Sequence, residues 1–301
     1  MDIDLIGRIK TSALRLLPSV VQLRRDFHKY PELSFEEKET SLKVMRFLDD
    51  LHIPYTHGWA GHGIVASVRG SQPGPMVMLR ADMDALPITE ENRVPYTSAH
   101  IGVMHACGHD VHMSSLLGVA AILHEHAEHL EGEVKLVFQP GEEKLPGGAS
   151  LMIHDGLFKP QIPERMIGQH VHPPLPAGHV GFRSGLYMAS ADEIYITIEG
   201  KGGHAATPHL CIDPIVIAAR VVTALQELIS RHIDPLSPGV FTIGKIQSDG
   251  GATNVIPDRV RLEGTLRAMN ETWREEAHVK IRQVTEGLCT ASGARAEVSI
   301  L

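Results

Sequence analysis

Short apolar segments with the length of strands alternate with longer helical segments over about the first 170 residues, and this alternation restricts the fold more than any other feature. The run Met76–Leu79 is apolar enough to form a strand buried in the middle of a sheet. The other expected elements are strands at 63–68, 134–138 and 165–170, two helices within 12–52, and a long helix at 111–129. This order predicts an α/β fold with a mainly parallel sheet flanked by helices.

The order of the elements changes near residue 190. The segments expected from there on are a strand at 192–199, a helix at 212–232, strands at 239–247 and 257–267, a helix at 270–290 and a strand at 295–301. A β-α-β-β-α-β order is typical of a ferredoxin-like unit. We therefore predict two domains, residues 1–188 and residues 189–301.

Composition and charge exclude several classes of protein. The apolar fraction of 43% and the charged fraction of 21% are ordinary for a soluble globular chain. A net charge of −8 without blocks of Lys and Arg argues against a nucleic-acid partner. No apolar run reaches the length of a membrane span, and no secretory signal is visible. The three cysteines are widely spaced and odd in number, which favours a reducing cytoplasm over a disulfide framework.

Three short blocks carry side chains that bind divalent metals: Cys107-Gly108-His109, Glu142-Glu143 and His170-Val171-His172. Each block lies where a predicted strand meets a loop or a helix, and open α/β sheets bind their ligands at the carboxyl ends of strands. Taken alone, a cysteine is usually a small buried side chain, a glutamate pair is usually solvated, and a histidine is usually structural. Their shared position at three strand ends predicts a metal site.

The adjacent carboxylates Glu142 and Glu143 suit hydrolysis. Neighbouring side chains in an extended segment point to opposite sides, so one carboxylate can bind a metal while the other faces a water. A metal lowers the pKa of its water, and a carboxylate beside it removes the proton.

Seven sequence blocks extend this hypothesis. They are Arg25-Asp26-Phe27-His28 with Pro31-Glu32-Leu33, the run from Leu79 to Pro87, the run from His105 to Asp110, the run from Gln139 to Glu143, His170-Val171, the run from Gly202 to Ala206, and the run from Asn254 to Pro257. With these blocks in this order, the chain resembles the metal-dependent amidohydrolase branch of the aminoacylase and carboxypeptidase-type metallopeptidases. That branch includes hippurate hydrolase, auxin-amino-acid conjugate hydrolases and N-acetyldiaminopimelate deacetylase.

The resemblance implies a pair of divalent ions, Mn or Zn. Their ligands would be Cys107, His109, Glu143 and His170. The general base would be Glu142. The thiolate favours Zn, whereas the carboxylate suits either metal.

Asp82 and Asp84 follow the strand at Met76–Leu79. The resemblance assigns them to the surroundings of the metals, where they would orient a ligand histidine. A capped turn after a strand is the alternative explanation for both. His105 and His112 are expected to flank the site without binding metal.

In the family the second domain acts as a lid. The resemblance implies that His204, in a glycine-rich loop, stabilises the oxyanion of the tetrahedral intermediate. Asn254 and Arg267 would hold the carboxylate of the substrate, although Arg267 is equally well explained as a solvated charge at a strand end. Some relatives pair two subunits through the lid, so a homodimer is one expected arrangement.

Two differences separate this chain from the family pattern. Relatives return to the catalytic domain after the lid and supply one more metal-binding histidine, whereas this sequence ends at Leu301. Either the chain is a fragment, which we favour because a sheet without its last strands exposes an edge, or it is a short protein with an incomplete site. The second difference is Gly141, which stands where relatives commonly have Ala.

The sequence therefore predicts an amidohydrolase that cleaves N-acyl amino acids or similar small conjugates. One alternative is a dipeptidase or exopeptidase of the same superfamily. Another is a catalytically impaired metal-binding relic. A structural zinc site is disfavoured because such sites use four Cys or His ligands and have no use for paired glutamates.

Overall fold

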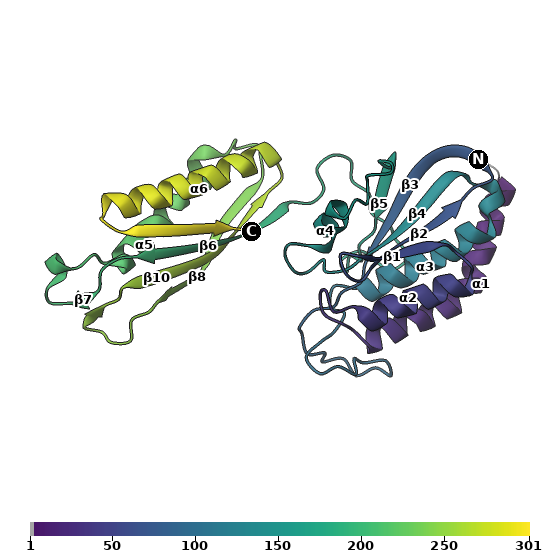
Figure 1. Cartoon of the computed structure of the whole chain (residues 1–301), viewed down its shortest axis with the longest axis horizontal. Coiled ribbons are helices and arrows are strands. Elements are labelled where there is room, and N and C mark those ends of the chain that lie inside the picture. The colour runs from purple at the N-terminus through teal and green to yellow at the C-terminus, as the bar shows by residue number, and fades with distance from the viewer. Residues whose placement is uncertain (1–2) are drawn as a thin grey trace. The chain divides into compact units, whose positions relative to one another are not determined.

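The computed structural model describes residues 3–301, which form two compact units (Figure 1). The first unit ends at Gly178, and the second runs from His179 to Leu301. The domain boundary predicted between residues 188 and 189 lies a little further along the chain, and it stays a prediction. Each unit is described by itself.

The first unit contains a five-stranded sheet with the order β1-β2-β4-β3-β5. Its strands are β1 (Tyr55–Trp59), β2 (Gly63–Arg69), β3 (Gln72–Asp82), β4 (Glu131–Gln139) and β5 (Arg165–Gly168). Strand β3 pairs in parallel with β4 and β5, whereas β2 pairs antiparallel with β1 and β4. The predicted α/β class is confirmed, and the sheet is mixed because β1 and β2 add antiparallel pairings.

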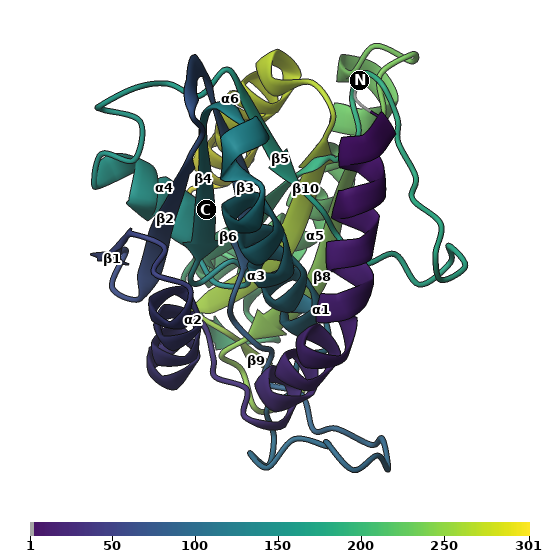
Figure 2. The same cartoon turned by 90° about the vertical axis from the view of Figure 1, so that its right-hand side faces the viewer.

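Helices cover both faces of this sheet. The helices α1 (Ile3–Lys29), α2 (Lys38–Asp50) and α3 (His109–Glu125) lie on one face, and α4 (Gly148–His154) lies on the other (Figure 1). Figure 2 shows α1 and α3 side by side. Helix α1 begins earlier than the range expected from the sequence. None of the helices in the described part of the chain is long and apolar enough to cross a membrane.

The alternation of side chains along the central strands explains these layers. In β4, Leu136 and Phe138 face α1, α2 and α3, and Val137 faces α4. Full burial of a leucine or phenylalanine stabilises the fold by about 1.5–3 kcal/mol, so both faces of the strand drive packing. Strands buried in this way hold their ends firmly, and the loops that follow β3, β4 and β5 meet at one edge of the sheet.

The second unit contains an antiparallel sheet with the order β11-β6-β10-β8. Its elements are β6 (Ser190–Glu199), α5 (Pro214–Leu225), β8 (Gly239–Ser248), β10 (Arg259–Ala268), α6 (Glu271–Ala291) and β11 (Arg295–Ile300). The predicted β-α-β-β-α-β order is present. The predicted helix at 212–232 is divided into α5 and a π-helical turn at Leu228–His232.

Within this unit, the helices α5 and α6 cover one face of the sheet. Alternate residues of β6, such as Ile194 and Ile196, pack against α5 and α6, while Glu193 and Tyr195 point to the open face. A polar face opposite an apolar one is typical of an antiparallel sheet with helices on one side.

One acidic residue lies on the buried face of β6. Asp192 is fully buried and accepts hydrogen bonds from Arg274 Nε at 2.9 Å and from Arg274 Nη2 at 2.6 Å. His278 Nε2 lies 3.1 Å from the same carboxylate. Because a buried carboxylate is stable only with partners, this contact ties α6 to β6.

We predict that Asp192→Ala lowers the free energy of unfolding of the second unit by about 3 kcal/mol, because it removes the buried carboxylate partner of Arg274 and leaves that guanidinium with only the exposed Glu271 as an ion-pair partner. Glu199→Ala is the matched control, because Glu199 lies on the same strand as Asp192 but forms an exposed ion pair, with Arg259 of β10. Loss of this exposed pair should cost less than about 1 kcal/mol. Urea unfolding followed by Trp273 fluorescence in a Trp59→Phe background measures both. Equal losses in the two variants would contradict the prediction.

Candidate metal centre

The potential metal ligands predicted in the first unit converge at one edge of its sheet. Cys107 and His109 lie at the start of α3, Glu142 and Glu143 follow β4, and His170 lies two residues after the end of β5. Their donor atoms form two groups, Cys107 with His109 and His170, and His109 with Glu142 and Glu143. Within each group the donor atoms lie within 4.8 Å of one another. His109 belongs to both groups, and its donor atoms also lie near those of Asp82 and His112, which form a third group with it.

The distances from His109 Nε2 to the carboxylates around it fit a cation better than direct hydrogen bonding. His109 Nε2 lies 3.6 Å from Asp82 Oδ2, 3.8 Å from Glu143 Oε1 and 3.9 Å from Glu142 Oε2. It is buried and has no hydrogen-bond partner among the described residues. Cys107 Sγ lies 3.3 Å from His170 Nε2. A buried imidazole nitrogen without a partner, facing thiol, imidazole and carboxylate donors, is the arrangement that a divalent ion would satisfy.

The orientation of His109 is fixed from the opposite side of its ring. Its Nδ1 lies 2.8 Å from the carbonyl oxygen of Asp84 and 3.3 Å from Asp84 Oδ1. Donation from Nδ1 leaves Nε2 as the nitrogen that faces the donors. Gly108 allows this turn because its φ is +88° and because a Cβ there would lie 2.3 Å from Val171 Cγ2.

A second histidine connects β3 with the segment that carries His170. His112 Nδ1 donates to Asp82 Oδ1 at 2.6 Å, and His112 Nε2 accepts from the Val171 amide at 3.0 Å. Arg80 donates to Asp82 Oδ2 at 2.7 Å. Burial opposes ionisation of Asp82, but these two partners lower its pKa to about 2. His112 is thus engaged at both ring nitrogens and orients the loop instead of offering a free donor.

His105 and His172 contribute no atom to either donor group. His105 is buried, and neither of its ring nitrogens has a hydrogen-bond partner among the described residues. Burial lowers its pKa to about 4, which keeps the ring neutral. His172 is exposed. The expectation that His105 and His112 flank the site without binding metal stays a prediction.

The centre carries an excess of negative charge. Burial would lower the pKa of His109, but the contacts of its ring with Asp84 and Cys107 and the charge of Asp82 raise it to about 11. Burial raises the pKa of Glu142, and the charge of Glu143 raises it further. A site that retains a proton on a buried imidazole in this way is one where a positive charge is strongly stabilised.

Two contacts around the centre were not predicted from the sequence. Arg80 pairs with Asp82, and the hydroxyl of Ser34 donates to Asp84 Oδ2 at 2.6 Å. The first pair follows the strand period, because residues two apart share a face. The second joins residues 50 positions apart, which no local spacing indicates.

In the second unit, the structure brings two of the three predicted residues together. Strand β7 (Gly203–His204) pairs with β9 (Val255–Ile256), and the Ala205 amide donates to the carbonyl oxygen of Asn254 at 3.0 Å. His204 therefore lies in a small two-stranded sheet, and Asn254 directly precedes the second strand of that sheet.

Arg267 lies at the other end of β10. It pairs with Ala191 at the start of β6, whereas Arg259 pairs with Glu199 at the end of β6, next to the β7–β9 sheet. From Arg259 to Arg267 an extended strand rises about 26 Å. Within this unit, Arg267 is thus separated from His204 and Asn254.

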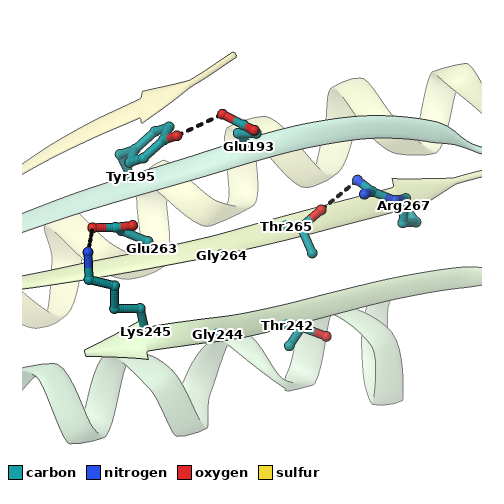
Figure 3. A pocket seen from close by; sticks show the side chains of 9 residues that line it. All are labelled: Glu193, Tyr195, Thr242, Gly244, Lys245, Glu263, Gly264, Thr265 and Arg267. Atoms are coloured by element: carbon teal, nitrogen blue, oxygen red, sulfur yellow. Dashed lines mark hydrogen bonds and ion pairs between the residues drawn. The ribbon is translucent and has the colours of Figure 1, made fainter. Parts of the chain in front are cut away.

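Arg267 lines a hollow on the open face of the sheet (Figure 3). Glu193 and Tyr195 of β6 line the same hollow, as do Lys245 of β8 and Glu263 of β10. Arg267 is exposed, and its Nη1 donates to Thr265 Oγ1 at 2.5 Å (Figure 3).

Comparisons with known proteins agree with this fold and centre. The sequence model of Peptidase family M20/M25/M40 matches residues 78–287. An N-acetylcysteine deacetylase of Bacillus subtilis is 39% identical over 283 residues, which cover 92% of this chain and 72% of the relative. Thermostable carboxypeptidase 1 of Saccharolobus solfataricus is 38% identical over 300 residues, which cover 99% of this chain and 76% of the relative.

A solved structure gives the same result. The YXEP protein of Bacillus subtilis, described as a dinuclear metal binding peptidase from the M20 family, superposes with a TM-score of 0.78 at 35% identity. The match covers 97% of this chain and 74% of that protein. The chain is therefore a hydrolase that belongs to Peptidase family M20/M25/M40.

Proposed function

We propose that this chain is a metal-dependent amidohydrolase that cleaves the amide bond of N-acyl amino acids or similar small conjugates. The observation that carries the proposal is the unpartnered Nε2 of His109, which faces a thiol and paired carboxylates at one sheet edge. The relative named N-acetylcysteine deacetylase supports the substrate class, since its name describes removal of an acyl group from an amino acid.

Cys107, His109, Glu143 and His170 would hold two divalent ions. The relative described as dinuclear supports the number of ions. Zn and Mn both fit the donors, because the thiolate favours Zn and the carboxylate accepts either. A bound divalent ion would polarise the substrate carbonyl and lower the pKa of a water.

Glu142 is proposed as the general base. Its side chain is 41% exposed, compared with 23% for Glu143, so it is the more accessible of the two to substrate and water. Its raised pKa suits a group that takes a proton from water and returns it to the leaving amine. Glu143 would then remain a ligand throughout.

His204, Asn254 and Arg267 would act on the substrate from the second unit. His204 would stabilise the oxyanion, and the other two would hold the carboxylate. Arg267 and the His204–Asn254 pair lie at opposite ends of β10, so one lid domain cannot easily bring all three to the same small substrate. This separation favours a site to which the lid domains of two subunits contribute. We therefore keep a homodimer through residues 189–301 as the proposed assembly. A cytoplasmic location, inferred from the cysteine content, also stays a prediction.

A dipeptidase or exopeptidase is the second candidate, supported by the relative named thermostable carboxypeptidase 1. A panel of N-acetyl and N-benzoyl amino acids assayed beside unblocked dipeptides separates the two, because only the first class lacks a free amino group. A catalytically impaired relic is the third candidate, and it predicts no turnover with either panel at full metal occupancy.

We predict that Glu142→Gln lowers kcat by about 10²–10⁴-fold, because the amide cannot accept the proton from water. The metal content of the purified protein should be unchanged. Glu143→Gln is the matched variant, since the same substitution one position later should reduce metal content as well as turnover. Elemental analysis and initial rates measure both, and a wild-type rate in Glu142→Gln would refute the proposed function.

We also predict that Cys107→Ala weakens metal binding by more than about 100-fold, because loss of a ligand should exceed the loss caused by an outer partner. Cys211→Ala is the control, because Cys211 is the other partly exposed free cysteine and lies in the second unit. Calorimetric titration of the chelator-treated protein with Zn²⁺ and Mn²⁺ compares them. Equal affinities in the two variants would exclude Cys107 as a ligand.

A further inference from the structure

The backbone on both sides of Glu142 is held by buried carboxylates. The Gly141 amide donates to Glu37 Oε1 at 2.7 Å, and the Glu143 amide donates to Asp84 Oδ2 at 2.9 Å. Glu37 is fully buried, and it lies 104 positions before Gly141 in the sequence. Hydrogen bonds from backbone amides to charged acceptors are among the stronger ones in proteins. The peptide that carries Glu142 is therefore fixed at two points.

An aromatic ring supports the same peptide. Phe35 has a φ of +67°, which is uncommon for a residue with a side chain. Its ring lies so close to Gly141 that a Cβ there would be 2.4 Å from Phe35 Cε1 and Cζ. Gly141 itself has a φ of +55°. The ring of Phe35 and the carboxylate of Glu37 thus confine one glycine.

The segment that carries these two residues, Leu33–Glu37, is itself anchored at the end of β3. Leu33 forms a bridge with Ala85, and the Ala85 amide donates to the Glu32 carbonyl oxygen at 2.8 Å. Ser34 donates to Asp84 Oδ2 at 2.6 Å. The segment therefore connects the residues that orient His109 with the loop that carries Glu142.

A carboxylate is energetically unfavourable at the buried position of Glu37. Its Oε2 is buried without a hydrogen-bond partner among the described residues. Burial raises its pKa, and the charge of Asp84 raises it further, although backbone donors act in the opposite direction. An apolar residue would avoid this unfavourable burial, so packing alone does not account for a carboxylate here.

We propose that Glu37, supported by Phe35, is a positioning residue for hydrolysis: its hydrogen bond to the Gly141 amide sets the direction in which Glu142 presents its carboxylate to the reacting water. The inference rests on the proposed role of Glu142 as general base. Glu37 does not contact substrate or metal and acts only through the loop.

Amide hydrogen exchange tests the structural half of the proposal without any activity measurement. Glu37→Ala should make the Gly141 amide of the metal-free protein exchange at least about tenfold faster, because its acceptor is lost. Glu37→Gln retains an acceptor oxygen and should keep the protection. Glu36→Ala, the control, removes an exposed carboxylate one position earlier and should leave Gly141 unchanged. Unchanged exchange in Glu37→Ala, or equal acceleration in Glu37→Gln, would overturn the proposal.

Kinetics of the metal-loaded enzyme test the catalytic half. Glu37→Ala should lower kcat by about 100-fold with KM within about twofold, since misplacement of a reacting group by about 1 Å has an effect of this size. In a Glu142→Gln background it should cause no further loss, because both changes remove the same function. Additive losses, or a wild-type kcat in Glu37→Ala, would overturn the proposal.

Two outcomes separate this inference from the proposed function. A wild-type rate in Glu142→Gln would refute the general base itself, whereas a normal loss in Glu142→Gln with a wild-type rate in Glu37→Ala would refute only the positioning role. If Glu37→Ala does not fold, Phe35→Gly takes its place. Glycine suits a φ of +67°, and removal of the ring should raise exchange at Gly141 and lower kcat. Unchanged exchange and kcat in Phe35→Gly would then overturn the inference.

Discussion

The two carboxylates buried at the end of β3 are the constraint on which the metal centre depends. Asp84 contacts His109 directly and holds the Glu143 amide, so it fixes two donor segments at once. Asp82 fixes the third donor segment, the one that carries His170. It does so through His112, which donates a hydrogen bond to Asp82 and accepts one from the amide that follows His170. Three loops far apart in the sequence therefore depend on a single strand end, and the strong packing of β3 between two layers makes that end rigid.

The same carboxylates give the centre an excess of negative charge. Asp82, Asp84 and the paired glutamates lie around the buried imidazole of His109, and Arg80 pairs with Asp82 alone among them, so the other carboxylates need a further positive charge. The raised pKa of His109 indicates that a proton on its ring can supply this positive charge when no metal ion is bound. Because a ligand imidazole must release that proton, metal binding and proton release are coupled at this site, and affinity for the ion should rise with pH.

Much of this arrangement could be predicted from the sequence, because short apolar runs such as Met76–Leu79 identify strand ends, and strand ends identify where ligands gather. Strand β1 was missed because its residues are mostly exposed and lack an apolar pattern. Glu37 was missed because its partner lies 104 positions away, and contacts of that range follow from packing, which no local spacing encodes. The separation of Arg267 from Asn254 was also hidden, since the 12 residues between them say little until most are known to belong to the extended strand β10.

The contact between Phe35 and Gly141 has a consequence for sequence variation. With the phenylalanine ring 2.4 Å from the place where a Cβ would stand, even alanine at position 141 requires the ring to move. A smaller residue at position 35 would remove that obstacle. The two positions should therefore covary: chains with alanine in the loop before the paired glutamates should carry a different residue, or a different backbone, where this chain has Phe35.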